Sequence, residues 1–128
     1  MSFLHKYRTA ALVCLTVIAG MASPKAAEKP HAVIVIGTLH YSPELTMPAF
    51  AKELDRLGFS STIVMGEGNP EKKTIDVLPG IDALAKADVA IFFMRFLKLP
   101  DAQWQPIEDY LKSGKPIIGL RTANHSFK

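Results

Sequence analysis

Four short apolar runs divide the chain, and a polar turn follows each of them. The runs at 31–37 and 88–94 hold five and six consecutive apolar residues, without the alternation that a half-exposed strand would show. Such runs are typical of strands that are buried on both faces of a parallel sheet. Shorter runs at 59–65 and 116–120 complete a predicted set of four strands, and the strand at 116–120 is also expected to be buried.

The segment between the first two strands has helical spacing of its apolar residues and ends at Gly58, a residue suited to the left-handed position after a helix. Two starts compete for this helix. Ser42 would cap it with Pro43 in the first position, or Thr46 would cap it with Pro48 still in the first turn. The second start keeps proline out of the helix interior, so we expect the helix to begin at Thr46.

A short helical crossover is predicted at 81–87, and a longer helix at 102–113. The apolar stripe of the longer helix consists of Trp104, Ile107, Tyr110 and Leu111. Strands alternating with helices indicate an α/β, flavodoxin-like parallel sheet with right-handed connections and helices on both faces. The chain ends eight residues after the fourth strand, where a covering helix is due. We therefore expect a domain that is truncated after its fourth strand.

Residues 1–22 have the composition of a secretory signal: a cationic start, an apolar run at 9–19 and small residues up to Ala22. The run is shorter than the ~20 apolar residues that span a bilayer. An uncleaved anchor is the alternative. We expect a linker at 23–30, a domain at 31–128, and a secreted or periplasmic protein that has no membrane association after cleavage.

Charge and cysteine content exclude several functions. The chain has 15 basic and 12 acidic residues, and Lys6 and Arg8 lie in the signal, so 13 against 12 leaves a mature charge of about +1. This balance gives no reason to expect a nucleic-acid partner. The single cysteine, Cys14, also lies in the signal. The mature chain would therefore have no disulfide, no thiolate nucleophile and no cysteine metal ligand.

Polar side chains follow all four predicted strands. In open α/β sheets, ligands bind at the carboxyl ends of the strands, so these residues are the candidate site. They are His40 and Tyr41 after the first strand, Glu67 after the second, Arg95 after the third, and Arg121, Thr122, Asn124 and His125 after the fourth.

Two stretches, GTLHYSPELTMPAFAKELDRLGFSSTIV at 37–64 and ADVAIFFMRFLKLPDAQWQPIEDYLKSGKPIIGLRTANHSF at 87–127, resemble the trehalose-utilisation (ThuA-like) family. The resemblance covers most of 31–127 and is strongest from Gly114 to Thr122 and at His125. It implies a class I glutamine amidotransferase-like fold and a link to carbohydrate metabolism. Family domains are longer than this one, which agrees with the expected truncation.

The fourth turn departs from the pattern of that superfamily. Glutamine amidotransferases place a cysteine here, as Gly-x-Cys-x-Gly, because a thiolate attacks the amide carbon. Alignment of Gly119 to Ala123 on this pattern puts Arg121 at the cysteine position. Arginine stays protonated and cannot attack. We therefore expect this turn to bind a ligand rather than to hydrolyse glutamine.

Three functions are open at this point. The first is a sugar-binding or carbohydrate-active domain with a small-molecule ligand, in which Glu67 or His125 does acid–base work. Its ligand would be held by His40, Tyr41, Arg95, Arg121, Thr122 and Asn124. The second is a metal-dependent hydrolase or isomerase with zinc on His40, Glu67 and His125. The third is a non-catalytic binding remnant. A homo-oligomer is compatible with each of them.

Overall fold

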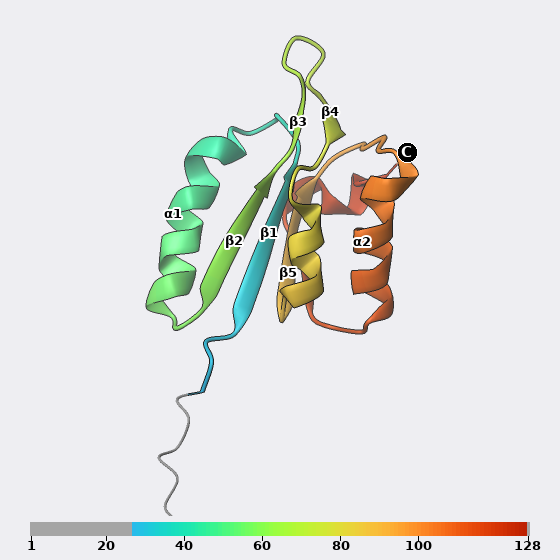
Figure 1. Cartoon of the computed structure of the whole chain (residues 1–128). Coiled ribbons are helices and arrows are strands. Elements are labelled where there is room, and N and C mark those ends of the chain that lie inside the picture. The colour runs from blue at the N-terminus through green and yellow to red at the C-terminus, as the bar shows by residue number, and fades with distance from the viewer. Residues whose placement is uncertain (1–26, 128) are drawn as a thin grey trace, which may run out of the picture.

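The structure is a computed structural model that describes residues 27–127 (Figure 1). Its centre is a four-stranded parallel sheet. In spatial order the strands are β2 (Ser60–Met65), β1 (His31–Gly37), β5 (Val89–Met94) and β6 (Ile117–Gly119). Counting only these strands along the chain gives the order 2-1-3-4, which is the flavodoxin-like order. The predicted α/β, flavodoxin-like class is therefore confirmed. The predicted signal at 1–22 and most of the linker lie outside the described residues.

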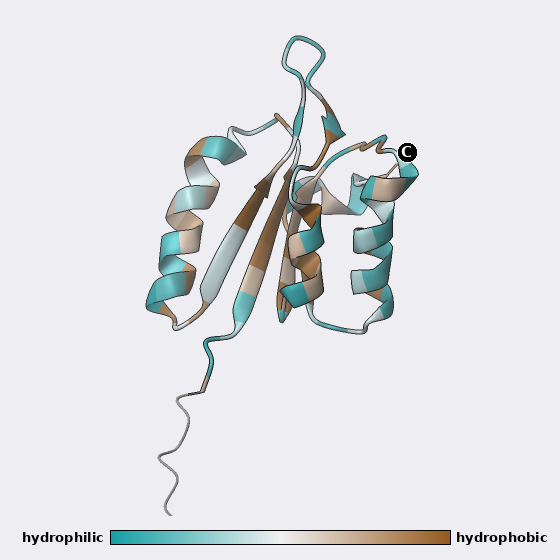
Figure 2. Cartoon of the chain, viewed as in Figure 1, coloured by the Kyte–Doolittle hydropathy of each residue, from teal (hydrophilic) through white to brown (hydrophobic). Residues whose placement is uncertain are grey.

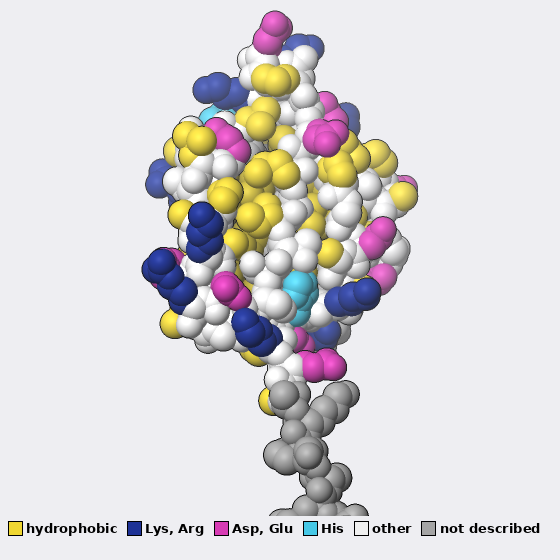
Figure 3. All heavy atoms as spheres, turned by 60° about the vertical axis from the view of Figure 1, so that its left-hand side comes forward, with side chains coloured by type: hydrophobic (Ala, Val, Ile, Leu, Met, Phe, Trp, Pro, Cys, Tyr) yellow, Lys and Arg dark blue, Asp and Glu magenta, His cyan; other side chains and the backbone are white. Residues whose placement is uncertain are grey.

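Helices cover both faces of the sheet, as predicted (Figure 1). On one face lies α1 (Pro43–Arg56), and on the other lie η2 (Ile81–Lys86), a 3-10 helix, and α2 (Asp101–Lys112). The strands and the sheet-facing sides of the helices carry the hydrophobic residues (Figure 2). On the side that carries α1 and β2, hydrophobic side chains gather in the middle of the face, and charged ones lie around its rim (Figure 3). No helix among residues 27–127 has the length and apolarity needed to cross a bilayer.

The predicted stripe of α2 is only partly in the core. Ile107 and Tyr110 are buried, and Trp104 packs against the core while it contacts the ring of Phe127 edge-on at 4.6 Å. Leu111, however, is 41% exposed. The helix therefore packs by its middle turns, and one apolar position of the stripe faces solvent.

The start of α1 differs from our expectation. The helix begins at Pro43, with Ser42 at the N-cap, so the expected start at Thr46 is wrong. Pro43 is fully buried, and the fixed φ of proline suits the first helical position. Pro48 consequently lies inside the helix, where it cannot donate a backbone hydrogen bond. The helix thus accommodates both prolines, one at its first position and one inside it.

The end of α1 agrees with the sequence. Gly58 adopts a φ of 91° just after the helix. Its N–H donates to the carbonyl of Asp55, and the N–H of Phe59 donates to the carbonyl of Leu54, each at 3.0 Å. These two bonds satisfy the last carbonyls of the helix in the manner of a Schellman motif.

A β-hairpin between β2 and η2 was not predicted. Its strands are β3 (Glu67–Asn69) and β4 (Thr74–Val77), which pair antiparallel and project beyond the carboxyl end of the sheet (Figure 1). Ile75 anchors the hairpin in the main core at 5% exposure. The segment between β2 and η2 therefore contains a second, small sheet.

The prediction of a buried fourth strand is also wrong. Only three residues of β6 pair with β5, and Ile117 and Ile118 remain 48% and 45% exposed. Among the described residues no strand pairs with the outer side of β6. An apolar run at the edge of a sheet is exposed because it has a neighbour on one side only.

Candidate functional site

The loops after β1, β5 and β6 bring four of the predicted site residues together in two pairs. The Nε2 atom of His40 lies 3.3 Å from Nη1 of Arg95. The guanidinium carbon of Arg121 lies 3.9 Å from the centroid of the Tyr41 ring. Each pair joins the loop after β1 to the residues after another strand. The loops at the carboxyl ends of the strands therefore place these four side chains near one another, and the rings of His40 and Tyr41 are 6.1 Å apart.

The turn after β6 is a sharp elbow. Leu120 is extended, Arg121 has a φ of 48°, and a 3-10 helix, η3 (Arg121–His125), follows at once. A Cβ atom added at Gly119 would lie 3.2 Å from the Cβ of Ala123, so the elbow needs small residues at both of these positions. The geometry matches the strand–turn–helix elbow on which hydrolases of other folds expose a nucleophile. Here the exposed residue is an arginine.

Backbone strain is concentrated at this edge. A non-glycine residue in the left-handed region costs about 1–3 kcal/mol, and such residues cluster at binding and active sites. Five of the described non-glycine residues have a positive φ, and all of them lie in loops on the carboxyl side of the sheet. They are Tyr41 (71°), Ser42 (49°), Lys73 (51°), Phe96 (49°) and Arg121 (48°). Their location agrees with the choice of the carboxyl ends of the strands as the candidate site.

His40 has a lowered pKa, which favours its neutral form. Burial lowers the pKa of His40 from its ordinary value, and the positive charges of Arg95 and Lys73 lower this pKa further. Arginine can only donate hydrogen bonds, so Nε2 of His40 accepts from Arg95 and the proton is on Nδ1. That Nδ1 atom lies 3.3 Å from Oγ1 of Thr38, which is 3% exposed. The imidazole therefore links a buried hydroxyl to an arginine that faces the loops.

A pocket of about 280 Å³ lies between these loops and the β3–β4 hairpin. We call it the hairpin pocket. It is lined by His40, Arg95 and Phe96 from the strand loops and by Glu71, Lys72, Lys73 and Thr74 from the hairpin. The two lysines were not predicted as site residues, because a short polar stretch such as 71–73 usually indicates only a solvated turn.

The remaining predicted residues after β6 have local partners. The hydroxyl of Thr122 donates to the carbonyl of Met94 at 3.1 Å and ties η3 to β5. Nδ1 of His125 lies 2.8 Å from Oδ1 of Asn124, and the His125 ring contacts Phe96 edge-on at 5.8 Å. Both His125 and Asn124 are exposed. Thr122 thus stabilises the elbow, while the other two lie on its outer surface.

Glu67 is separated from the rest of the predicted site. It is the exposed first residue of β3, where it pairs across the hairpin with Val77, and it is not among the residues that line the hairpin pocket. No hydrogen bond joins Glu67 to His125, the other candidate for acid–base work. Within residues 27–127 no group of three or more His, Cys, Asp or Glu side chains is placed to hold a metal ion. His40, Glu67 and His125, the ligands of the zinc alternative, are therefore not brought together in the described part of the chain.

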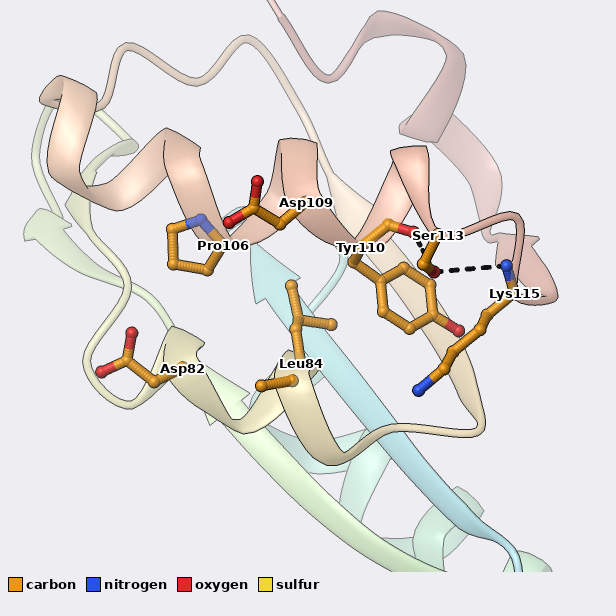
Figure 4. A pocket seen from close by; sticks show the side chains of 8 residues that line it. Asp82, Leu84, Pro106, Asp109, Tyr110, Ser113 and Lys115 are labelled. Carbon is orange, nitrogen blue, oxygen red and sulfur yellow. Dashed lines mark hydrogen bonds between the residues drawn. The ribbon is translucent and has the colours of Figure 1, made fainter.

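A second hollow, of about 290 Å³, lies between η2 and α2 (Figure 4). Its polar groups are used to hold the fold together. Nζ of Lys115 donates to the carbonyl of Ala87 at 2.7 Å, and the hydroxyl of Tyr110 donates to the carbonyl of Pro116 at 2.8 Å. These bonds fix the residues that precede β5 and β6, at the amino ends of the strands and opposite the elbow. The hollow is therefore a packing feature of the fold.

No protein-family model, curated protein or solved structure matches this chain. Fold and site together define the class of protein: a flavodoxin-like α/β domain whose carboxyl edge carries a strained, cationic surface with an arginine on its elbow.

Proposed function

We propose that this chain is a ThuA-like domain that binds a sugar-type ligand at the carboxyl ends of its strands and does not hydrolyse glutamine. One observation carries the proposal. Arg121 occupies the elbow with a φ of 48°. The sequence resemblance aligns this position with the cysteine of the amidotransferase superfamily. The backbone that would expose a nucleophile exposes instead a group that can only donate hydrogen bonds.

The chemistry of the neighbours supports a polyhydroxylated ligand. The ring of Tyr41 lies against the guanidinium of Arg121, whose five N–H donors point outward in the guanidinium plane and can bind vicinal hydroxyls or a carboxylate. Tyr41 is itself 50% exposed and offers aromatic surface beside those donors. A guanidinium with free N–H donors next to an exposed aromatic ring suits a sugar better than a purely apolar ligand.

Binding is better supported than catalysis. Glu67 and His125 are not in contact, and the metal-dependent alternative lacks a ligand cluster within the described residues. We therefore favour the binding version over the hydrolase or isomerase alternative. On the strength of residues 1–22 we further propose that the protein is secreted or periplasmic. N-terminal sequencing of exported protein should then begin near Ser23, and an intact Met1 on cytoplasmic protein would contradict export.

The sugar proposal is tested by calorimetric titration of the chain with glucose, trehalose and glucuronate. Arg121→Lys keeps the charge and loses the planar fork, so the affinity for at least one of these ligands should fall about 5–150-fold, which corresponds to about 1–3 kcal/mol. Arg56→Lys is the matched control, because Arg56 is an exposed arginine on α1 that pairs only with Glu53. Arg121→Cys should not acquire glutaminase activity, because Ala123 stands where the second glycine of that motif belongs.

Two outcomes would contradict the proposal. One is that none of the sugars binds to the wild-type chain. The other is that Arg121→Lys binds as tightly as the wild type while its melting temperature falls. Arg121 would then be a structural residue.

A further inference from the structure

The hairpin pocket has an excess of positive charge. Three cations, Arg95, Lys72 and Lys73, line it together with a single carboxylate, Glu71, so three minus one leaves a local charge of +2. Within the described residues neither lysine takes part in an ion pair. Uncompensated cations gathered around a hollow attract an anion, and because both lysines are exposed this attraction weakens as salt is added.

Arg95 is fixed in position within this pocket. Its guanidinium lies 4.5 Å above the centroid of the Phe96 ring, and its Nη1 atom donates to His40. Its backbone N–H donates to the carbonyl of Gly37 at 3.2 Å, which ties the residue to the end of β1. Four of the five guanidinium N–H donors are left for a ligand, in a plane that the ring and the imidazole define.

The two lysines are presented by a structured turn. The N–H of Lys72 donates to Oδ1 of Asn69 at 2.9 Å, and the N–H of Lys73 donates to the carbonyl of Pro70 at 3.3 Å. Lys73 adopts a φ of 51°, which directs the chain back into β4. Ile75 anchors that strand in the core. The turn therefore holds both ammonium groups on a supported hairpin rather than on a long free loop.

We propose that the hairpin pocket is a subsite for the phosphate group of a phosphorylated sugar; the sugar part of this ligand rests on the proposed function. A phosphate monoester carries a charge of about −1.5 to −2 at pH 7 and matches the +2 of the pocket. Lysine and arginine together are typical phosphate ligands. A volume of about 280 Å³ is below the usual range of about 300–1,000 Å³ for complete ligands, so the pocket suits one group of a larger molecule.

The position of the pocket relative to the elbow supports a shared ligand. His40 lines the pocket, and its ring centroid is 6.1 Å from that of Tyr41, whose ring contacts Arg121. A ligand with its phosphate beside Arg95 would therefore extend its ring toward Tyr41. A carboxylate is the second source of negative charge, but it carries only one charge and satisfies fewer donors.

The test compares glucose 6-phosphate, inorganic phosphate, glucuronate and glucose by calorimetry, with phosphorus NMR for the two phosphates. The test variant is Lys72→Gln with Lys73→Asn, because asparagine tolerates the left-handed backbone of position 73. The control variant is Lys52→Gln with Lys86→Gln, which removes two exposed lysines of α1 and η2 and changes the net charge equally. Circular dichroism and thermal melting check that each variant folds.

Glucose 6-phosphate should bind to the wild type about tenfold or more tightly than glucose, and added potassium chloride should weaken this preference. The test variant should lose about tenfold or more of its affinity for both phosphates and keep its affinity for glucose, while the control variant keeps both. Glucuronate that binds as tightly as glucose 6-phosphate would assign the subsite to carboxylates and overturn the phosphate assignment.

The two proposals can fail separately. If glucose binds in an Arg121-dependent way but phosphate adds no affinity, or if the test variant binds phosphate as well as the wild type does, the phosphate subsite is wrong and the sugar site stands. If inorganic phosphate binds and depends on the two lysines, but no sugar adds affinity, the subsite stands and the sugar proposal is wrong.

Discussion

The strands β1 and β6 are similar in sequence and different in surroundings. Both are short apolar runs that end at a polar turn. β1 pairs along six residues with each of two neighbours, and Ala32 to Ile36 are 0% exposed. β6 pairs along three residues with one neighbour, and its two isoleucines are nearly half exposed. An apolar run thus predicts a strand, while the neighbours of the strand decide how deeply it is buried.

The two strands nevertheless supply the same site. The loop after β1 contributes Tyr41 and the elbow after β6 contributes Arg121, and both residues have a positive φ. One side of the site is therefore built on β1, the most buried strand of the sheet, and the other on β6, its exposed outer strand. Regions with few buried contacts open locally at low cost, so the elbow after β6 should be more mobile than the loop after β1.

The largest difference that we expect between β1 and β6 is in the free energy of unfolding that is lost when one isoleucine is shortened. Ile34→Ala, in the middle of β1, should lower the free energy of unfolding by about 2–5 kcal/mol, because it removes fully buried methylenes and leaves a cavity. Ile118→Ala, on β6, should lower it by less than about 1 kcal/mol, because its side chain is already 45% exposed. Urea denaturation followed by circular dichroism measures both values. Equal losses would mean that β6 is as deeply packed as β1.

A smaller effect concerns pH and the loop after β1. The pKa of His40 is lowered in the folded chain, so below pH 6.5 the unfolded chain binds more protons than the folded one. The contribution of His40 to stability is therefore fully present above pH 6.5 and is lost as the pH falls toward its folded pKa. Between pH 7.5 and 5 the wild type should lose more stability than His40→Gln does, measured as the shift in urea midpoint. Identical shifts in the two proteins would show that the pKa of His40 is not lowered in the folded chain.

Most of the architecture could be predicted from the sequence, because central strands and helix ends have strong local signals. The uninterrupted apolar run of β1 predicted its bounds, and Gly58 predicted the end of α1. The hairpin had a weaker signal. In Thr74–Val77 the side chain of Ile75 is buried between two exposed neighbours, an alternation that the sequence already contains. A run of four residues is too short to separate from a polar linker by pattern alone.

The sequence predicted where the candidate site lies but not all of the side chains that line its pocket. The rule that ligands bind at carboxyl strand ends placed His40, Arg95 and Arg121 at one edge, where the structure has them. Glu67 follows β2 as expected, yet the unpredicted hairpin carries it away from the pocket and brings the neighbouring lysines in instead. Which side chain enters a pocket depends on the pairing register of the hairpin, and sequence spacing does not contain that register.

We propose above all that the strained backbone of the elbow exposes the Arg121 guanidinium to a ligand. The most direct measurement is on Arg121→Asn, in which asparagine keeps the left-handed backbone and removes the cation. The variant should melt within about 5 °C of the wild type, since only an exposed contact with Tyr41 worth about 0.5–1 kcal/mol is lost. Its calorimetric affinity for the sugar that the wild type binds should fall about 5–150-fold. Unchanged affinity together with a much lower melting temperature would contradict the claim and make Arg121 a residue that serves the fold alone.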